Sequence, residues 1–254
     1  MTRTRVALLV LTPVLLVGLA LCTNQGRNLA WAVYTKVRGR FTVEERLEQY
    51  GDRADARLAP HFSAADVSYP PPVLVLVGLK RERLLEVYAG RTRETLHFIR
   101  AYPVLAASGT LGPKLREGDR QVPEGVYEIE SLNPNSRFHL SLRLGYPNAF
   151  DRKQADAEQR KNLGDDIMIH GGAQSVGCLA IGDDAIEELF VLVARVGTAN
   201  TRLILCPCDF RENAPPADPD APWWVAGLYH RLESELRSLP KGTERSFQNT
   251  LRSQ

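Results

Sequence analysis

The segment MIHGGAQSVGCLAIGDDAIEELF, residues 168–190, joins an apolar strand, a glycine-rich loop and the start of a helix. It contains one of the five histidines and one of the four cysteines of the chain. His170 ends the apolar strand, and Cys178 precedes the apolar pair Leu179 and Ala180. We therefore expect a strand–loop–strand unit that brings the side chains of His170 and Cys178 face to face.

A thiol beside an imidazole can form a thiolate–imidazolium pair, which lowers the pKa of the cysteine and makes it nucleophilic. We predict that Cys178 is the nucleophile of an acyl-transfer site and that His170 is its general base and acid. The alternative is a structural histidine beside a buried structural cysteine. The remaining predicted loop residues are Gly171, Gly172, Ser175 and Gly177, with Ser175 shaping the loop and the amides of Gly177 and Cys178 facing an oxyanion.

Residues 73–212 are predicted to form a mainly β domain with packed helices, an α+β fold. The prolines of YPPP, residues 69–72, mark its start. One strong helix, DDAIEELFVLVARVG, interrupts the strands, and Asp183 is expected to cap it. The predicted strands lie in VLVLVGLKRERLLEVYAG (two strands around a charged turn), TLHFIRAYPVLAAS, GVYEIESL, FHLSLRLG, DDIMIHG and TRLILC.

Helices are also expected on both sides of this domain. Residues 23–72 are predicted to be a helical stem, because Thr42 and Glu45 have capping-box spacing. Apolar residues follow them at helical spacing. Residues 213–254 are predicted to be a Pro-rich linker, an amphipathic helix in PWWVAGLYHRLESELRSL and a polar tail.

Residues 1–22 are expected to be a signal peptide or a membrane anchor. Arg3 and Arg5 precede an apolar run from Val6 to Leu21, which is slightly shorter than the ~20 residues of a comfortable spanning helix. Cys22 adds the alternative of a lipidated N-terminus. Each alternative brings the chain to a membrane during export and places the rest of it in the periplasm or otherwise outside the cytoplasm.

The composition narrows the class of partner. The 254 residues are 44% hydrophobic and 24% charged, which is typical of a globular protein. The net charge is only +2, so the charge balance gives no electrostatic case for nucleic acid as a partner.

The IHGG and SVGCLAIGD elements resemble the His-Gly…Ser-x-Gly-Cys signature of the YkuD-type L,D-transpeptidase catalytic domain. The similarity is greatest to its YafK-like branch, where the interval between the two elements is contracted. It extends through AASGTLGPKLREGDRQVPEGVYEIESLNPNSRFHLSLRLGYPNAFD, residues 106–151, and covers roughly residues 73–212.

The resemblance implies a β-sandwich catalytic domain that acts outside the cytoplasm on peptidoglycan stem peptides containing diaminopimelate. It implies that Cys178 attacks the peptide carbonyl and forms a thioester, while His170 takes the thiol proton and later protonates the leaving amine. An amine acceptor then gives transfer, and water gives hydrolysis. No cofactor and no metal are expected.

One departure from the family pattern bears on the outcome of the reaction. An arginine commonly stands two residues after the cysteine in transpeptidases of this type, and here that residue is Ala180. The YafK-like branch includes an amidase that detaches a lipoprotein from peptidoglycan. Transfer and hydrolysis therefore both stay open, with a peptidoglycan-linked lipoprotein as a further possible partner.

Several other polar residues are candidates with weaker support. His139 is a candidate to orient His170, to contact substrate or to play a structural role. Cys206 and Cys208 are expected to be packed thiols, with a redox link as the alternative. The candidates for binding a stem-peptide carboxylate are Lys114, Arg116, Arg120 and Arg143. The runner-up function for the whole chain is a non-catalytic peptidoglycan-binding or scaffold protein that retains the fold.

Overall fold

A computed structural model describes residues 39–216 and 218–242. The predicted N-terminal signal or anchor and the polar end of the tail lie outside these residues. Within the described ranges, no helix is both long and apolar enough to cross a bilayer. The described residues from Val43 onward form one compact unit, which contains all the elements described below.

The strands form a nine-stranded series in the order β3-β2-β1-β9-β5-β6-β7-β8-β4. β1 pairs in parallel with β9, β7 pairs in parallel with β8, and the other pairs are antiparallel. The strands are β1 (Val73–Leu79), β2 (Leu84–Gly90), β3 (Leu96–Pro103), β4 (Ala106–Ala107), β5 (Gly125–Ser136), β6 (His139–Leu144), β7 (Met168–His170), β8 (Leu179–Ala180) and β9 (Thr201–Cys206).

Strand β5 connects the two halves of this series. Its first residues, Gly125 to Glu128, pair with β9. Its later residues, Ile129 to Ser136, pair with β6, which leads to β7 and β8. The predicted strands are present, and the α+β class is confirmed.

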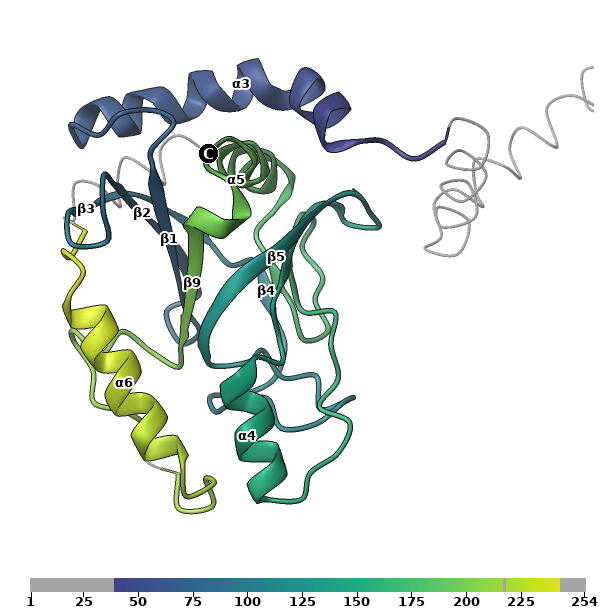
Figure 1. Cartoon of the computed structure of the whole chain (residues 1–254), viewed down its shortest axis with the longest axis vertical. Helices are drawn as coiled ribbons and strands as arrows, with labels where there is room; N and C mark the ends of the chain where they lie inside the picture. Colours follow the sequence, from purple (N-terminus) through teal and green to yellow (C-terminus); the bar gives the residue numbers. More distant parts are fainter. Residues whose placement is uncertain (1–38, 217, 243–254) are drawn as a thin grey trace, which may run out of the picture. The chain divides into compact units, whose positions relative to one another are not determined.

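Strand β1 is apolar along its whole length because both of its faces are buried, as is usual for an internal strand with a parallel neighbour. Leu74 and Leu76 lie in one hydrophobic cluster together with helices α3 (Val43–Ala64) and α5 (Asp183–Val196). Val75 and Val77 lie in a second cluster with helix α6 (Val225–Arg237). Figure 1 shows α3 and α5 beyond one side of the sheet and α6 beyond the other.

Helix α3 is the helix expected in the stem. Its apolar positions Tyr50, Ala54, Leu58 and Phe62 are buried in the same cluster as α5 and the sheet. α3 and α5 lie next to each other in Figure 1, and the pair is also joined by ion pairs from Arg57 to the carboxylates of α5. The stem helix is therefore packed into the core.

The expectation of a single helix among the strands is wrong, because a second helix, α4, spans Ala149–Ala157. It begins at a capping box in which the Asn148 side chain accepts from the Asp151 amide at 3.0 Å and the Asp151 carboxylate accepts from the Asn148 amide at 2.9 Å. Phe150 packs edge-on against Trp224, with ring centroids 5.7 Å apart. The end cap and this distant contact stabilise a helix too short to show a clear period.

The predicted cap of α5 is also wrong. The N-cap residue is Gly182, which makes no side-chain cap hydrogen bond and has φ of 85°. Asp183 is the first helical residue, and its carboxylate accepts instead from the Gly172 amide at 2.8 Å. The side chain is thus used to hold the loop that follows β7.

We predict that Leu58→Ala lowers the free energy of unfolding by about 2–5 kcal/mol, because it leaves a cavity in the core between α3 and the sheet. Asp52→Ala on the exposed side of the same helix should change it by less than about 0.5 kcal/mol. Denaturant unfolding of both variants measures the difference. Equal stability of the two would contradict the assignment of α3 to the core.

Candidate active site

The parallel pairing of β7 with β8 places the two predicted catalytic residues. Ile169 is the register partner of Leu179, and His170 is the partner of Ala180. Cys178 stands one residue before β8, so continuing this register puts it beside Met168. Side chains alternate along a strand, and Cys178 therefore shares a face with His170 although the two are offset by two residues rather than directly opposite.

His170 is held in one tautomer. Its Nδ1 lies 2.7 Å from the carbonyl oxygen of Gly171, so Nδ1 carries the proton and Nε2 keeps its lone pair. The ring is buried and stacks on Phe138, with centroids 4.5 Å apart. Burial lowers the pKa of His170 more than the Gly171 hydrogen bond raises it. The imidazole is therefore neutral near pH 7 and can accept a proton at Nε2.

Cys178 is half-buried at the end of the loop, and its thiol donates to the carbonyl oxygen of Asp166 at 3.7 Å. Burial raises the pKa of this thiol, a hydrogen bond to the Met168 backbone lowers it by less, and the charges of Asp166 and Lys114 act in opposite directions with smaller effects. Burial thus favours the neutral form of both groups and opposes the expected thiolate–imidazolium pair.

The two amides expected to face an oxyanion have partners in this structure. The Gly177 amide donates to the Ser108 hydroxyl at 2.5 Å, and the Cys178 amide donates to the Ser175 hydroxyl at 3.0 Å. Ser175 also donates to the Cys178 carbonyl at 2.6 Å. Ser175 thus has the contacts of a loop-shaping hydroxyl, and the expectation of unoccupied amides is wrong for the resting site.

The glycines after β7 are needed for close approach. A Cβ on Gly171 would lie 2.6 Å from both the Asp183 carboxylate and the Phe138 carbonyl oxygen. Gly172 has φ of 68°, a left-handed conformation in which its amide reaches Asp183. The sequence did not indicate this role of Asp183, because its position before an apolar run is equally typical of a helix cap.

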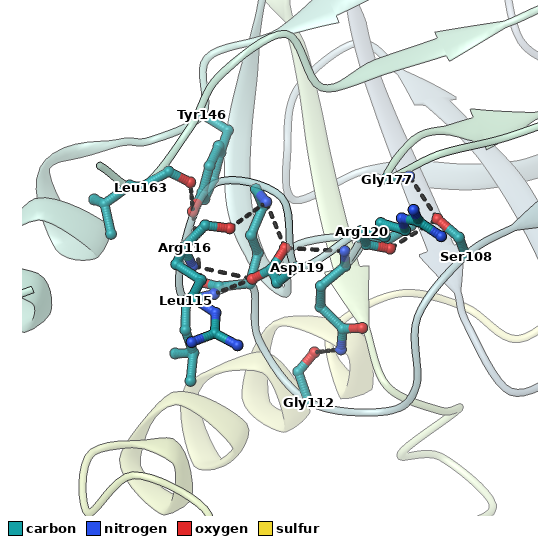
Figure 2. A network of polar contacts seen from close by, with 12 residues as sticks. Ser108, Gly112, Leu115, Arg116, Asp119, Arg120, Tyr146, Leu163 and Gly177 are labelled. Atoms are coloured by element: carbon teal, nitrogen blue, oxygen red, sulfur yellow. Dashed lines mark hydrogen bonds and ion pairs between the residues drawn. The ribbon is translucent and has the colours of Figure 1, made fainter. Parts of the chain in front are cut away.

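Residues 108–121, here called the 108–121 loop, form a second wall beside the Cys178 loop. The Asp119 carboxylate accepts from the Lys114 ammonium at 2.5 Å and from three backbone amides of the same loop, at 2.9–3.0 Å (Figure 2). Burial opposes the charge on Asp119, but these donors together hold the pKa of Asp119 below its usual value. The loop is therefore closed around one carboxylate.

A buried ion pair fixes the end of this loop. The Lys80 ammonium donates to the carbonyls of Gly112 and Val122 and to the Glu124 carboxylate, at 2.8–3.1 Å. Glu124 also accepts from the Gly112 amide at 2.7 Å and from the Tyr229 hydroxyl of α6 at 2.8 Å. All three N–H donors of the Lys80 ammonium are bonded, which offsets the energetic cost of burying its charge.

Two of the candidate substrate-binding residues already have partners within the fold. His139 pairs with Glu187 of α5 at 2.8 Å and lies edge-on to Tyr50, so it contacts the helices and not His170. Arg143 forms ion pairs with Glu130 and Asp166. These contacts join parts of the fold to one another, and His139 and Arg143 therefore both already have partners.

The three cations of the 108–121 loop lie in different surroundings. Lys114 is buried against Asp119, and its charge acts on the Cys178 thiol. Arg120 is exposed, while its carbonyl accepts from Ser108 at 2.7 Å. Arg116 lines a cleft of about 900 Å³ between this loop and the start of α6, and neither His170 nor Cys178 lines that cleft.

Cys206 and Cys208 are fully buried in the cluster beneath α6, and neither forms a disulfide in the described part of the chain. Burial raises the pKa of both thiols. Over residues 39–216 and 218–242, no group of three or more His, Cys, Asp or Glu side chains is placed to hold a metal ion. The two cysteines are packed thiols in this structure.

The sequence profile of the L,D-transpeptidase catalytic domain, YkuD, matches residues 72–204, just over half of the chain. The chain therefore belongs to the YkuD family of L,D-transpeptidase catalytic domains. It is 38% identical over 124 residues to a provisionally named L,D-transpeptidase, YafK, of Escherichia coli K12. That match covers 48% of this chain and 47% of the relative, so the chain spans about half the length of the curated relatives it matches.

More distant likenesses are found among solved structures. The helical cell shape determining protein Pgp2 of Campylobacter jejuni is 21% identical with a TM-score of 0.44, over 57% of this chain and 50% of that one. L,D-transpeptidase 1 of Mycobacterium tuberculosis is 14% identical with a TM-score of 0.31, over 53% of this chain and 62% of that one. These likenesses are too low to assign an activity.

We predict that alkylation of Cys178 by iodoacetamide rises steadily from pH 7 to pH 9. The reactive form is the thiolate, and burial raises the pKa of this thiol, so the thiolate fraction grows over that range. Cys178→Ala measures the background from the other cysteines, and mass spectrometry locates the label. A plateau already reached below pH 7 would show that a thiolate–imidazolium pair exists at rest.

Proposed function

We propose that the chain is a cell-wall acyl-transfer enzyme that acts on diaminopimelate-containing peptidoglycan peptides through a thioester on Cys178. The observation that carries this proposal is the arrangement of β7 and β8. Continuing the register of these strands by one residue puts Cys178 on the same face as His170, whose Nδ1 proton is directed to Gly171, so that the lone pair is on Nε2. Family membership supports the class of substrate.

The proposed reaction starts from a thiol and a neutral imidazole, the forms that burial favours. As Cys178 attacks the peptide carbonyl carbon, His170 Nε2 accepts the thiol proton, and a tetrahedral oxyanion forms. The carbon–nitrogen bond then breaks, and the imidazolium gives its proton to the leaving amine. An acceptor amine or a water molecule attacks the thioester, loses its proton to His170, and releases Cys178 as a thiol when the imidazole returns that proton.

We infer that hydrolysis is slightly favoured over crosslinking. Ala180 is fully buried between His170 on β7 and Ala106 on β4, so the position offers no cation to a substrate carboxylate. Two of the cations near the site are already neutralised, Lys114 by Asp119 and Arg143 by acidic neighbours. An acceptor peptide held less firmly competes less well with water for the thioester.

The proposed hydrolytic activity includes that of an amidase that releases protein, such as a lipoprotein, from peptidoglycan. It places the enzyme outside the cytoplasm, where that substrate lies, with the N-terminal segment as export signal or anchor. The assay offers the purified protein diaminopimelate-containing muropeptides together with protein-linked peptidoglycan. Free stem peptide or free protein as the main product supports hydrolysis, whereas faster accumulation of diaminopimelate–diaminopimelate dimers would show an ordinary L,D-transpeptidase.

We predict that Cys178→Ala lowers turnover on the order of 10³-fold or more while leaving the folded structure unchanged, because it removes the nucleophile. Cys206→Ala and Cys208→Ala are matched controls that should keep most of the activity, since both thiols are packed away from the site. Muropeptide analysis by mass spectrometry gives the rates. Full activity in Cys178→Ala rejects the mechanism, and binding of peptidoglycan without any turnover by the native protein favours the scaffold alternative.

A further inference from the structure

The backbone next to the nucleophile is tied to a distant part of the chain by one hydroxyl. Gly177 is buried and adopts a left-handed conformation, with φ of 86°. Its amide donates to Ser108, which lies 69 positions earlier in the sequence, at 2.5 Å. Figure 2 shows this contact at the outer end of the polar network of the 108–121 loop.

The Ser108 hydroxyl has a fixed direction. It donates its own proton to the carbonyl oxygen of Arg120 at 2.7 Å. Its lone pairs are therefore the part that faces the Gly177 amide. Because both bonds are made, the hydroxyl acts as a bridge between the Cys178 loop and the 108–121 loop.

The other residues just before Cys178 do little to attach the backbone of this loop to the surrounding fold. Val176 is 72% exposed, and Ser175 bonds to Cys178 within the loop itself. The Ser108 hydroxyl thus supplies a tie between the loop backbone and the surrounding fold at the residue directly before the nucleophile.

The 108–121 loop can provide such a tie because it is held from inside. Asp119 accepts from four donors of the loop, and the Gln121 side chain bonds to both the amide and the carbonyl of Thr110. A Cβ on Gly109 would lie 1.9 Å from the Gln121 side chain, so the turn after Ser108 is closely packed. The position of Ser108 is therefore set by the closed loop.

We propose that Ser108 is a positioning residue for acyl transfer. Its hydroxyl holds the Gly177 amide and thereby fixes the direction from which the Cys178 thiol meets the peptide carbonyl. This inference rests on the proposed function of Cys178. Loss of the hydroxyl leaves the thiol and His170 in place but removes the restraint on the peptide unit between Gly177 and Cys178.

Two reactions of the same thiol separate positioning from a general structural role. Acyl transfer needs the sulfur, the carbonyl carbon and the oxyanion donors to be aligned, and a displacement of 1 Å can cost about 100-fold in rate. Alkylation by iodoacetamide forms no oxyanion and has no bound peptide to align with. A positioning residue therefore affects the first reaction much more than the second.

The experiment measures muropeptide turnover, alkylation of Cys178 and thermal unfolding for the native protein, Ser108→Ala and Ser108→Thr. We expect Ser108→Ala to lower kcat about 10- to 100-fold with little change in KM, and to alter the alkylation rate less than about threefold. Ser108→Thr keeps a hydroxyl and should recover most of the kcat. Thr110→Ala, in the same loop, loses a hydroxyl bonded only to Leu111 in the described structure and serves as the matched control.

Three outcomes would overturn the inference: native kcat in Ser108→Ala, an equal loss of turnover and alkylation together with a lower melting temperature, or a Ser108→Thr variant as slow as Ser108→Ala. Cys178→Ala is measured in parallel. If turnover by the native protein does not depend on Cys178, the proposed function fails. If it does depend on Cys178 and Ser108→Ala is as active as the native protein, only the inference about Ser108 fails.

Discussion

The ion pair between Lys80 and Glu124 connects the parts of the fold that surround the site. Lys80 follows β1, Glu124 precedes β5, and the Tyr229 hydroxyl brings α6 to the same carboxylate. Burying two charges is costly unless every donor and acceptor finds a partner. Here the Lys80 ammonium donates its remaining protons to the carbonyls of Gly112 and Val122. Satisfying the buried ion pair therefore fixes the course of the 108–121 loop.

The 108–121 loop in turn contacts the loop that carries Cys178. The loop carries Lys114, whose charge acts on the Cys178 thiol, and Ser108, whose hydroxyl takes the Gly177 amide. Burial raises the pKa of the Cys178 thiol and lowers the pKa of His170, so it favours the neutral form of both groups. In the proposed reaction, activation of Cys178 therefore requires proton transfer to His170.

The charged side chains around the site mostly pair with one another. Asp119 neutralises Lys114, acidic neighbours neutralise Arg143, and Glu187 binds His139. These pairs hold the loops in place, and they reduce the charge left over for holding an acceptor peptide. The same arrangement thus stabilises the walls of the site and favours water as the second nucleophile in the proposed reaction.

The sequence by itself determined the α+β class, the strands and the main helices, because apolar periodicity and turn residues are local signals. It also singled out His170 and Cys178 as the candidate pair. It did not reveal α4, the use of Asp183 or the contact between Ser108 and Gly177. Only the tertiary structure decided these, and it also decided that burial raises the pKa of the Cys178 thiol and lowers the pKa of His170. The physical reason is that hydrogen bonds between residues far apart in sequence, and the burial that shifts a pKa, depend on which segments the fold brings together.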